Sequence, residues 1–249
     1  MIEHQGFGQT PREITLNDRT NYVHLLSGGL DSAYSIFETV KRLKKVGESF
    51  VVHPIFFDYG HYASDCEWEK VIGIVEFIRA FLNDKSVIDD PVKISLKSDL
   101  FQWCKSQAFK GISGEEKPEI QNRNMILFSV LASYLIACAE NQNIRKTKFQ
   151  VTSGFKEKEL PDSKSTFFNK FTELLSIYRP EFTFHFHILN SMERQTVIRK
   201  TKDLLSGNEI ELKKLLALTI SCYSPTKDCH RCGLCYKCKN LDKEKTTSS

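Results

Sequence analysis

The sequence contains no hydrophobic run long enough for a membrane span. Its most apolar stretch, residues 125–139, holds two serines and a tyrosine and is shorter than the roughly 18 residues that a spanning helix requires. Residues 1–20 contain no apolar core of the kind that a secretory signal needs. We therefore expect a cytoplasmic protein that does not associate with a membrane.

No excess of one charge marks the chain either. It carries 35 Lys and Arg against 31 Asp and Glu, a formal net charge of +4. A surplus this small does not imply nucleic-acid binding, and we expect no nucleic-acid partner. The 249 residues are 41% hydrophobic and 27% charged, which excludes a wholly disordered chain and fits one large domain with a small appendage.

The cysteines are not spread through the chain as in a disulfide-stapled secreted domain. Five of the eight lie within residues 222–238, whereas Cys66, Cys104 and Cys138 occur singly. Such clustering points to a metal, because tetrahedral zinc takes four thiolate or imidazole ligands and C-x-x-C turns supply two at a time. Residues 232, 235 and 238 form two overlapping C-x-x-C steps. On spacing alone the fourth ligand is either Cys222 or Cys229, and His230 is a weaker candidate.

Apolar stretches alternate with helical patterns along the chain. We expect strands at residues 22–26, 50–57, 92–96, 149–153 and 182–188, and helices at residues 30–43, 68–81, 124–140, 167–178 and 197–204. This alternation predicts an α/β fold, a parallel five-stranded sheet with helices on both faces. Residues 111–118, with two glycines and a proline, are predicted to form a surface loop, and a lid is the alternative.

A glycine-rich turn follows the first expected strand. The stretch SGGLDS, residues 27–32, runs directly into an amphipathic helix. Gly28 and Gly29 permit a tight turn and let backbone N–H groups approach a ligand, and a helix N-terminus stabilises a phosphate. Ser27 and Ser32 add hydroxyl donors, and Asp31 fits if a divalent cation lies between it and the phosphate.

This turn has two other interpretations. Ser or Asp could simply cap the helix, since both are good N-cap residues. A P-loop hydrolase is disfavoured, because no Gly-Lys-Ser/Thr follows a four-residue spacer.

The turn resembles the PP-loop of the ATP pyrophosphatase superfamily, and further motifs narrow the resemblance. FDYG at residues 57–60, RNMIL at 123–127, SG at 153–154, PD at 161–162 and the cysteine stretch at 222–238 are together similar to the 7-cyano-7-deazaguanine synthase (QueC) family. The resemblance covers about residues 22–240. It implies an adenine nucleotide alpha hydrolase-like fold and an ATP-dependent ligase that converts 7-carboxy-7-deazaguanine and ammonia into the nitrile, through an adenylated acid and an amide.

The resemblance also assigns residues to roles. The cofactors implied are ATP, Mg²⁺ and Zn²⁺, with Asp31 and Arg123 as catalytic residues. The ATP contacts would be Leu26, Ser27, Gly28, Gly29, Asp31, Ser32 and Phe57. The substrate contacts would be Asp58, Tyr59, Arg123, Asn124, Pro161 and Asp162, and the zinc ligands Cys222, Cys232, Cys235 and Cys238.

These assignments imply a domain organisation. We expect an N-terminal extension at residues 1–20, a nucleotide-binding domain at 21–218, a zinc-binding module at 219–240 and a flexible tail at 241–249, in a homodimer. Four protein ligands would close the zinc site, which makes it structural and disfavours redox chemistry.

The sequence departs from the family pattern near the expected acceptor pocket. His61 stands where the family has Gln, the later His is absent, and Lys164 takes the place of an Arg. A paralogue associated with anti-phage defence, which couples the activated acid to a protein amine, is therefore an alternative. A tRNA-modifying PP-loop enzyme and a non-catalytic nucleotide-binding module are further alternatives.

Overall fold

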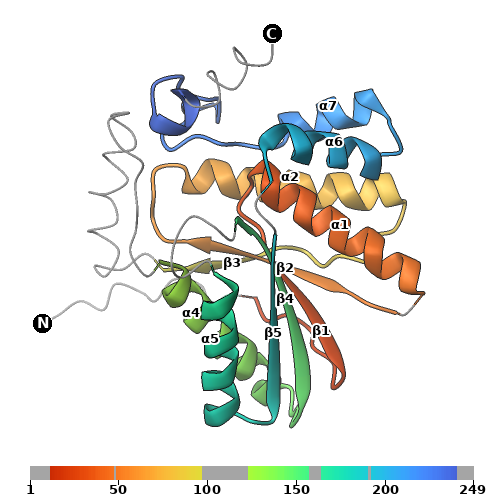
Figure 1. The fold of residues 1–249 in the computed structure, drawn as a ribbon, viewed down its shortest axis with the longest axis vertical. Coiled ribbons are helices and arrows are strands. Elements are labelled where there is room, and N and C mark those ends of the chain that lie inside the picture. The colour runs from red at the N-terminus through yellow and green to blue at the C-terminus, as the bar shows by residue number, and fades with distance from the viewer. Residues whose placement is uncertain (1–11, 48, 97–122, 157–163, 190–191, 240–249) are drawn as a thin grey trace, which may run out of the picture.

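A computed structural model describes residues 12–47, 49–96, 123–156, 164–189 and 192–239. Its centre is a five-stranded sheet with the strand order β3-β2-β1-β4-β5, in which all neighbours are parallel (Figure 1). The predicted parallel sheet is thus confirmed, and each expected strand is present. Their bounds are β1 Thr20–Leu25, β2 Val52–Asp58, β3 Val92–Ser95, β4 Thr147–Lys156 and β5 Phe182–Leu189.

Helices cover both faces of the sheet, as predicted. One face carries α1 (Leu30–Val46) and α2 (Ser64–Leu82), with α6 (Arg194–Leu204) and α7 (Glu209–Ala217) packed beside them. The other face carries α4 (Arg123–Asn141) and α5 (Ser165–Tyr178) (Figure 1). Because the central strands are covered on both sides, most of their described residues are buried, and every residue of β2 is buried.

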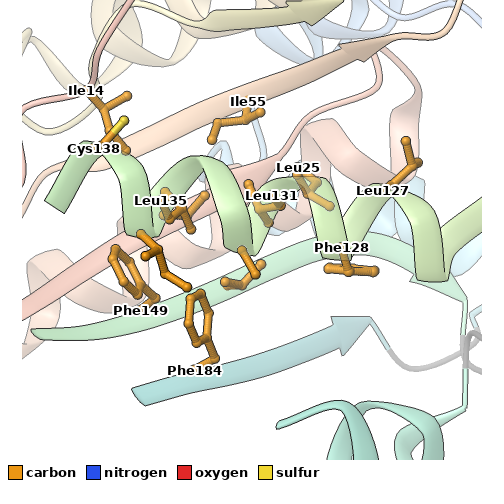
Figure 2. Close-up of a cluster of buried hydrophobic side chains, with 14 of the residues drawn as sticks. Ile14, Leu25, Ile55, Leu127, Phe128, Leu131, Leu135, Cys138, Phe149 and Phe184 are labelled. Carbon is orange, nitrogen blue, oxygen red and sulfur yellow. The ribbon is translucent and has the colours of Figure 1, made fainter. Parts of the chain in front are cut away.

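Helix α4 supplies most of the core on its face. Its apolar side chains recur at helical spacing and lie over the sheet, as Figure 2 shows for Leu127, Phe128, Leu131 and Leu135 above Phe149 and Phe184. Among the described residues α4 is the one helix long and apolar enough, by length and composition, to cross a membrane. Half of its most apolar window is buried inside the protein, and its hydrophobicity is explained by its place in this core.

The strand order puts a topological switch point at the carboxyl end of β1. The chain passes from β1 to β2 on one side, whereas β4 flanks β1 on the other, so Leu25 pairs with both Ile55 and Ser153. Below this point the buried His24 joins the two halves through Nδ1, 2.6 Å from the hydroxyl of Thr152. Open α/β sheets bind ligands at such a switch point, beyond the carboxyl ends of the strands.

The structure also contains an element that the sequence analysis missed. Helix α7 has only nine residues, and it begins at a true cap, where the Asn208 side chain accepts hydrogen bonds from the N–H groups of Ile210 and Glu211. The Gly-Asn pair before an acidic first turn was the available signal. Of the expected N-terminal extension, Ile14 and Leu16 are buried in the core. The predicted loop at residues 111–118 and the tail at 241–249 lie outside the described residues.

Candidate functional site

The glycine turn lies at the switch point between β1 and α1. Gly28 has φ +70°, a left-handed conformation that glycine adopts readily. Gly29 occupies the N-cap position of α1 and, having no side chain, makes no capping hydrogen bond. Instead the Ser32 hydroxyl donates back to the Gly29 carbonyl (3.2 Å) and accepts from the Ser27 N–H (3.1 Å). The N-cap residue is therefore Gly29 and not the Ser or Asp of the alternative interpretation, and the N–H groups in the first turn of a helix are suited to an anion.

Three segments hold this turn in place. A Cβ atom on Gly28 would lie only 2.8 Å from the Glu67 carbonyl oxygen in α2. A Cβ on Gly154, at the end of β4, would lie 2.6 Å from the backbone of Ser32. The Gly28 carbonyl also accepts a hydrogen bond of 2.9 Å from the N–H of Ile220. The turn is thus fixed by α2, by β4 and by the segment that leads into the cysteine cluster.

The predicted ATP contacts fall into two groups. The turn residues and Asp31, which is half-buried in the first turn of α1, lie together at the switch point. Leu26 and Phe57 are buried, on opposite faces of the sheet. Only the backbone of these two residues could contact a nucleotide.

The end of β2 carries the predicted substrate residues Asp58 and Tyr59. Asp58 is fully buried, accepts hydrogen bonds from the Gly60 N–H and the Ser64 hydroxyl, and lies 3.1 Å from Nζ of Lys93. These contacts fix the turn between β2 and α2. The Tyr59 ring packs with Leu96 and with Ile126 in the first turns of α4, so the start of α4 lies at the same edge as the end of β2.

The remaining substrate candidates lie at or beyond the start of α4. Asn124 is buried, and the guanidinium of Arg123 lies 3.4 Å from its Oδ1. Pro161 and Asp162 lie outside the described residues. The predicted contacts of all these residues with a substrate therefore stay predictions.

The structure contains a His–Glu pair beside Tyr59 that the sequence analysis did not identify. Nε2 of His61 lies 2.8 Å from Oε2 of Glu67, and the two side chains are only 10% and 19% exposed. The His61 ring stacks on Tyr59, with centroids 4.1 Å apart and an interplanar angle of 17°. His61 and Glu67 are six positions apart, across the end of a turn and the first turn of α2, so neither helix nor strand periodicity pairs them.

The four predicted zinc ligands converge. The sulfur atoms of Cys222, Cys232, Cys235 and Cys238 all lie within 4.8 Å of one another. The Sγ atom of Cys222 is 3.5, 3.9 and 3.7 Å from those of Cys232, Cys235 and Cys238. A tetrahedron of sulfurs at the zinc–sulfur bond length has edges of about 3.8 Å, so this arrangement fits a zinc ion.

The surroundings of the sulfurs act differently on the four thiols. Backbone N–H groups of Cys235 and Leu234 point at the Cys232 sulfur at 3.4 Å. Burial acts to raise the pKa of Cys232, but these N–H donors, together with the side chains of Cys222 and Cys235, outweigh it and bring the pKa to about 7. Burial raises the pKa of the Cys222 and Cys238 thiols. Burial alone would keep these two sulfurs protonated, and a bound cation would be needed to hold all four as thiolates, as in a Cys₄ zinc site.

Cys229 is not part of this cluster. It forms a disulfide with Cys66 in the first turn of α2, with Cα atoms 5.2 Å apart and 163 residues between the two in sequence. The structure therefore contradicts the alternative in which Cys229 replaces Cys222 as a ligand. The sequence analysis treats Cys66 as single, because spacing carries no information on a pair so far apart.

One surface pocket lies away from these groups. It is lined by Glu140, Arg145, Arg179 and neighbouring residues, at the amino ends of β4 and β5. Parallel sheets bind ligands at the opposite ends of their strands, so this pocket is not the candidate site.

Comparison with known proteins supports the resemblance. The family model described as queuosine biosynthesis protein QueC matches residues 21–244, most of the chain. None of the curated proteins compared with the chain matches it. The match includes the glycine turn, the end of β2, the start of α4 and the four cysteines.

Proposed function

The chain belongs to the QueC family, an ATP-dependent family of the PP-loop superfamily, and from this premise we propose that it adenylates 7-carboxy-7-deazaguanine and, with ammonia, forms 7-cyano-7-deazaguanine. AMP and pyrophosphate would be released. The observation that carries the proposal is the Gly28–Gly29 turn at the switch point, where a glycine in the N-cap position begins α1.

A carboxylate needs activation because its leaving group would otherwise be oxide. Transfer of an adenylyl group gives a mixed anhydride with AMP, which an amine can open. Chemistry of this kind depends on positioning and charge stabilisation rather than on a covalent enzyme intermediate. No catalytic nucleophile is therefore required of the chain.

The residues of the site suit these tasks. The N–H groups at the start of α1 and the hydroxyl of Ser27 would bind the β- and γ-phosphates, with Ser32 supporting the turn through its bonds to Gly29 and Ser27. Asp31 would hold Mg²⁺ beside the phosphates. Arg123 would neutralise phosphate or substrate charge. Tyr59, which packs against the start of α4, would line the acceptor side. Mg²⁺ would offset the charge of the phosphates when bound.

The four cysteines would hold a structural zinc ion. With all four positions filled by protein ligands, no site is left for a substrate. Ile220, two residues before Cys222, donates to the Gly28 carbonyl, so zinc would stabilise the segment that supports the phosphate-binding turn.

The test measures both half-reactions. Purified protein with ATP, Mg²⁺ and 7-carboxy-7-deazaguanine should catalyse acid-dependent exchange of pyrophosphate into ATP, and addition of ammonium should give the nitrile by mass spectrometry. Asp31→Asn should lower the exchange at least about 100-fold, because an amide binds Mg²⁺ poorly. Asp203→Asn, at an exposed position on α6, is the charge-matched control and should retain the wild-type rate.

Two results would contradict the proposal. If the Asp31→Asn variant catalysed pyrophosphate exchange at the wild-type rate, the proposed role of the turn in binding ATP and Mg²⁺ would be excluded. Exchange without any nitrile, accompanied by a mass gain of the acyl group on an added protein, would instead favour the protein-coupling alternative that the family departures raise.

A further inference from the structure

His61 is held in one orientation next to the proposed acceptor side. Its Nε2 lies 2.8 Å from Oε2 of Glu67, and its ring stacks on Tyr59. The backbone of Glu67 is the surface against which Gly28 packs. The His61–Glu67 pair therefore lies between the phosphate-binding turn and the predicted substrate residue at the end of β2.

The carboxylate determines which ring nitrogen of His61 can accept a proton. An ionised carboxylate only accepts hydrogen bonds, so Nε2 must carry the proton of the 2.8 Å contact. In the neutral ring Nδ1 then presents a lone pair. Nδ1 is buried, and no partner for it is present among the described residues. A buried nitrogen without a partner is costly, and a bound group that donates to it would remove that cost.

The proposed reaction requires such an acceptor. When ammonia attacks the acyl carbon of the adenylated acid, the nitrogen of the adduct becomes positively charged and must lose a proton before a neutral amide can form. Among the nearby carboxylates, Asp58 is already engaged by Gly60, Ser64 and Lys93, and Asp31 would hold Mg²⁺. Within the part of the chain that the structure describes, His61 offers this edge a basic atom with a fixed tautomer.

We propose that His61 is the base of the amide-forming step and that Glu67 is its positioning residue. The assignment rests on the proposed function. The C–N bond forms as ammonia adds to the acyl carbon, one proton of the nitrogen passes to Nδ1, and the C–O bond to the phosphate breaks, with AMP leaving with the electron pair. Glu67 stabilises the imidazolium until it releases the proton to water.

The assignment also gives meaning to the departure at this position. The family pattern has a glutamine, which cannot take up a proton, in place of His61, and it has its histidine two residues later, where this chain has Ala63. His61→Gln therefore restores the family glutamine but leaves this stretch without either histidine, and so removes the proposed base. Glu67→Gln changes the side chain that orients His61 and leaves intact the backbone carbonyl that contacts Gly28.

The experiment compares three rates for each variant: acid-dependent pyrophosphate exchange, amide formation with ammonium, and hydroxamate formation with hydroxylamine. Hydroxylamine is largely unprotonated near neutrality and gives a more acidic adduct, so it depends less on a base. For His61→Gln we expect exchange within about twofold of wild type, a loss of about 100-fold with ammonium, and a much smaller loss with hydroxylamine. Glu67→Gln should show the same pattern with a smaller loss, and His185→Gln, on the exposed side of β5, should match the wild type.

Other outcomes overturn the assignment in distinguishable ways. Amide formation by His61→Gln at the wild-type rate means that His61 is not the base. An equal fall of all three rates means that His61 acts only through the structure of the site. Absence of exchange in the wild-type protein overturns the proposed function, and this assignment with it.

Discussion

At the scale of single residues, Gly28 combines two constraints that a side chain would violate. Its φ of +70° is strained for any other residue, and a Cβ would lie 2.8 Å from the Glu67 carbonyl oxygen, a backbone atom that cannot rotate away. The first constraint belongs to the turn itself, and the second to the packing of α2 against it. Gly47, at the C-terminal end of α1, has φ +76°, but a Cβ added there would meet nothing within 4 Å, so it shares only the first constraint.

Comparison of Gly28 with Gly47 separates the free-energy cost of backbone strain from the cost of a packing clash. We expect Gly47→Ala to lower the free energy of unfolding by about 1–2 kcal/mol, the cost of a left-handed alanine. Gly28→Ala should cost at least about 1 kcal/mol more, because the turn or α2 must move, and it should also reduce pyrophosphate exchange. Denaturant unfolding of both variants measures the difference, and equal losses would show that the contact with Glu67 is not rigid.

At the scale of elements, α2 is tied to the segment before the last three cysteines. The Cys66–Cys229 disulfide joins the first turn of α2 to the zinc-site segment, and the next residue of that turn, Glu67, contacts both Gly28 and His61. One short stretch of helix therefore connects the glycine turn, the proposed base and the four-cysteine cluster. A bond across 163 residues restricts the unfolded chain strongly.

Removal of this bond should destabilise the protein without removing the metal. Under non-reducing conditions Cys66→Ser should lower the free energy of unfolding by about 2–4 kcal/mol, while zinc content stays near one ion per chain, since Cys66 and Cys229 are not ligands. In the presence of a dithiol reductant, the wild-type protein should lose the same stability and the variant should change little. Loss of zinc from Cys66→Ser would instead mean that the disulfide holds the metal site together.

At the scale of the whole molecule, the switch point collects segments from most of the chain. The turn after β1, the end of β4 at Gly154 and the N–H of Ile220 all meet there. The last of these contacts depends on the path of the chain into the cysteine cluster. We therefore expect the proposed metal site to influence the proposed nucleotide chemistry without taking part in it.

Loss of one ligand tests this coupling. Cys235 is fully buried. We expect the Cys235→Ser variant to release the metal and to lower acid-dependent pyrophosphate exchange at least about tenfold. The reason is that residues 219–239 would lose the ion that organises them. Limited proteolysis should then cut within that segment. Cys138→Ala, a buried thiol of α4 outside the cluster, is the control and should keep both metal and exchange. A metal-free Cys235→Ser variant with full exchange would show that the two sites are independent.

The sequence by itself determined the features that depend on neighbouring residues. Apolar stretches and helical spacing identify the five strands and all the described helices except α7, which is too short for its periodicity to stand out. The glycine turn, the end of β2, the start of α4, and three of the cysteines are recognisable because each motif is a few consecutive residues with a local geometric requirement.

Only the tertiary structure decided which distant groups meet. Cys222 joins the cluster while Cys229 pairs with Cys66, Ile220 supports Gly28, and His61 is oriented by Glu67 beside Tyr59. Spacing could not choose between Cys222 and Cys229, since both allow a four-cysteine set. The choice depends on where the folded sheet places α2 relative to the C-terminal segment, and such long-range proximity arises from the packing of the whole chain and leaves no periodic trace in the sequence.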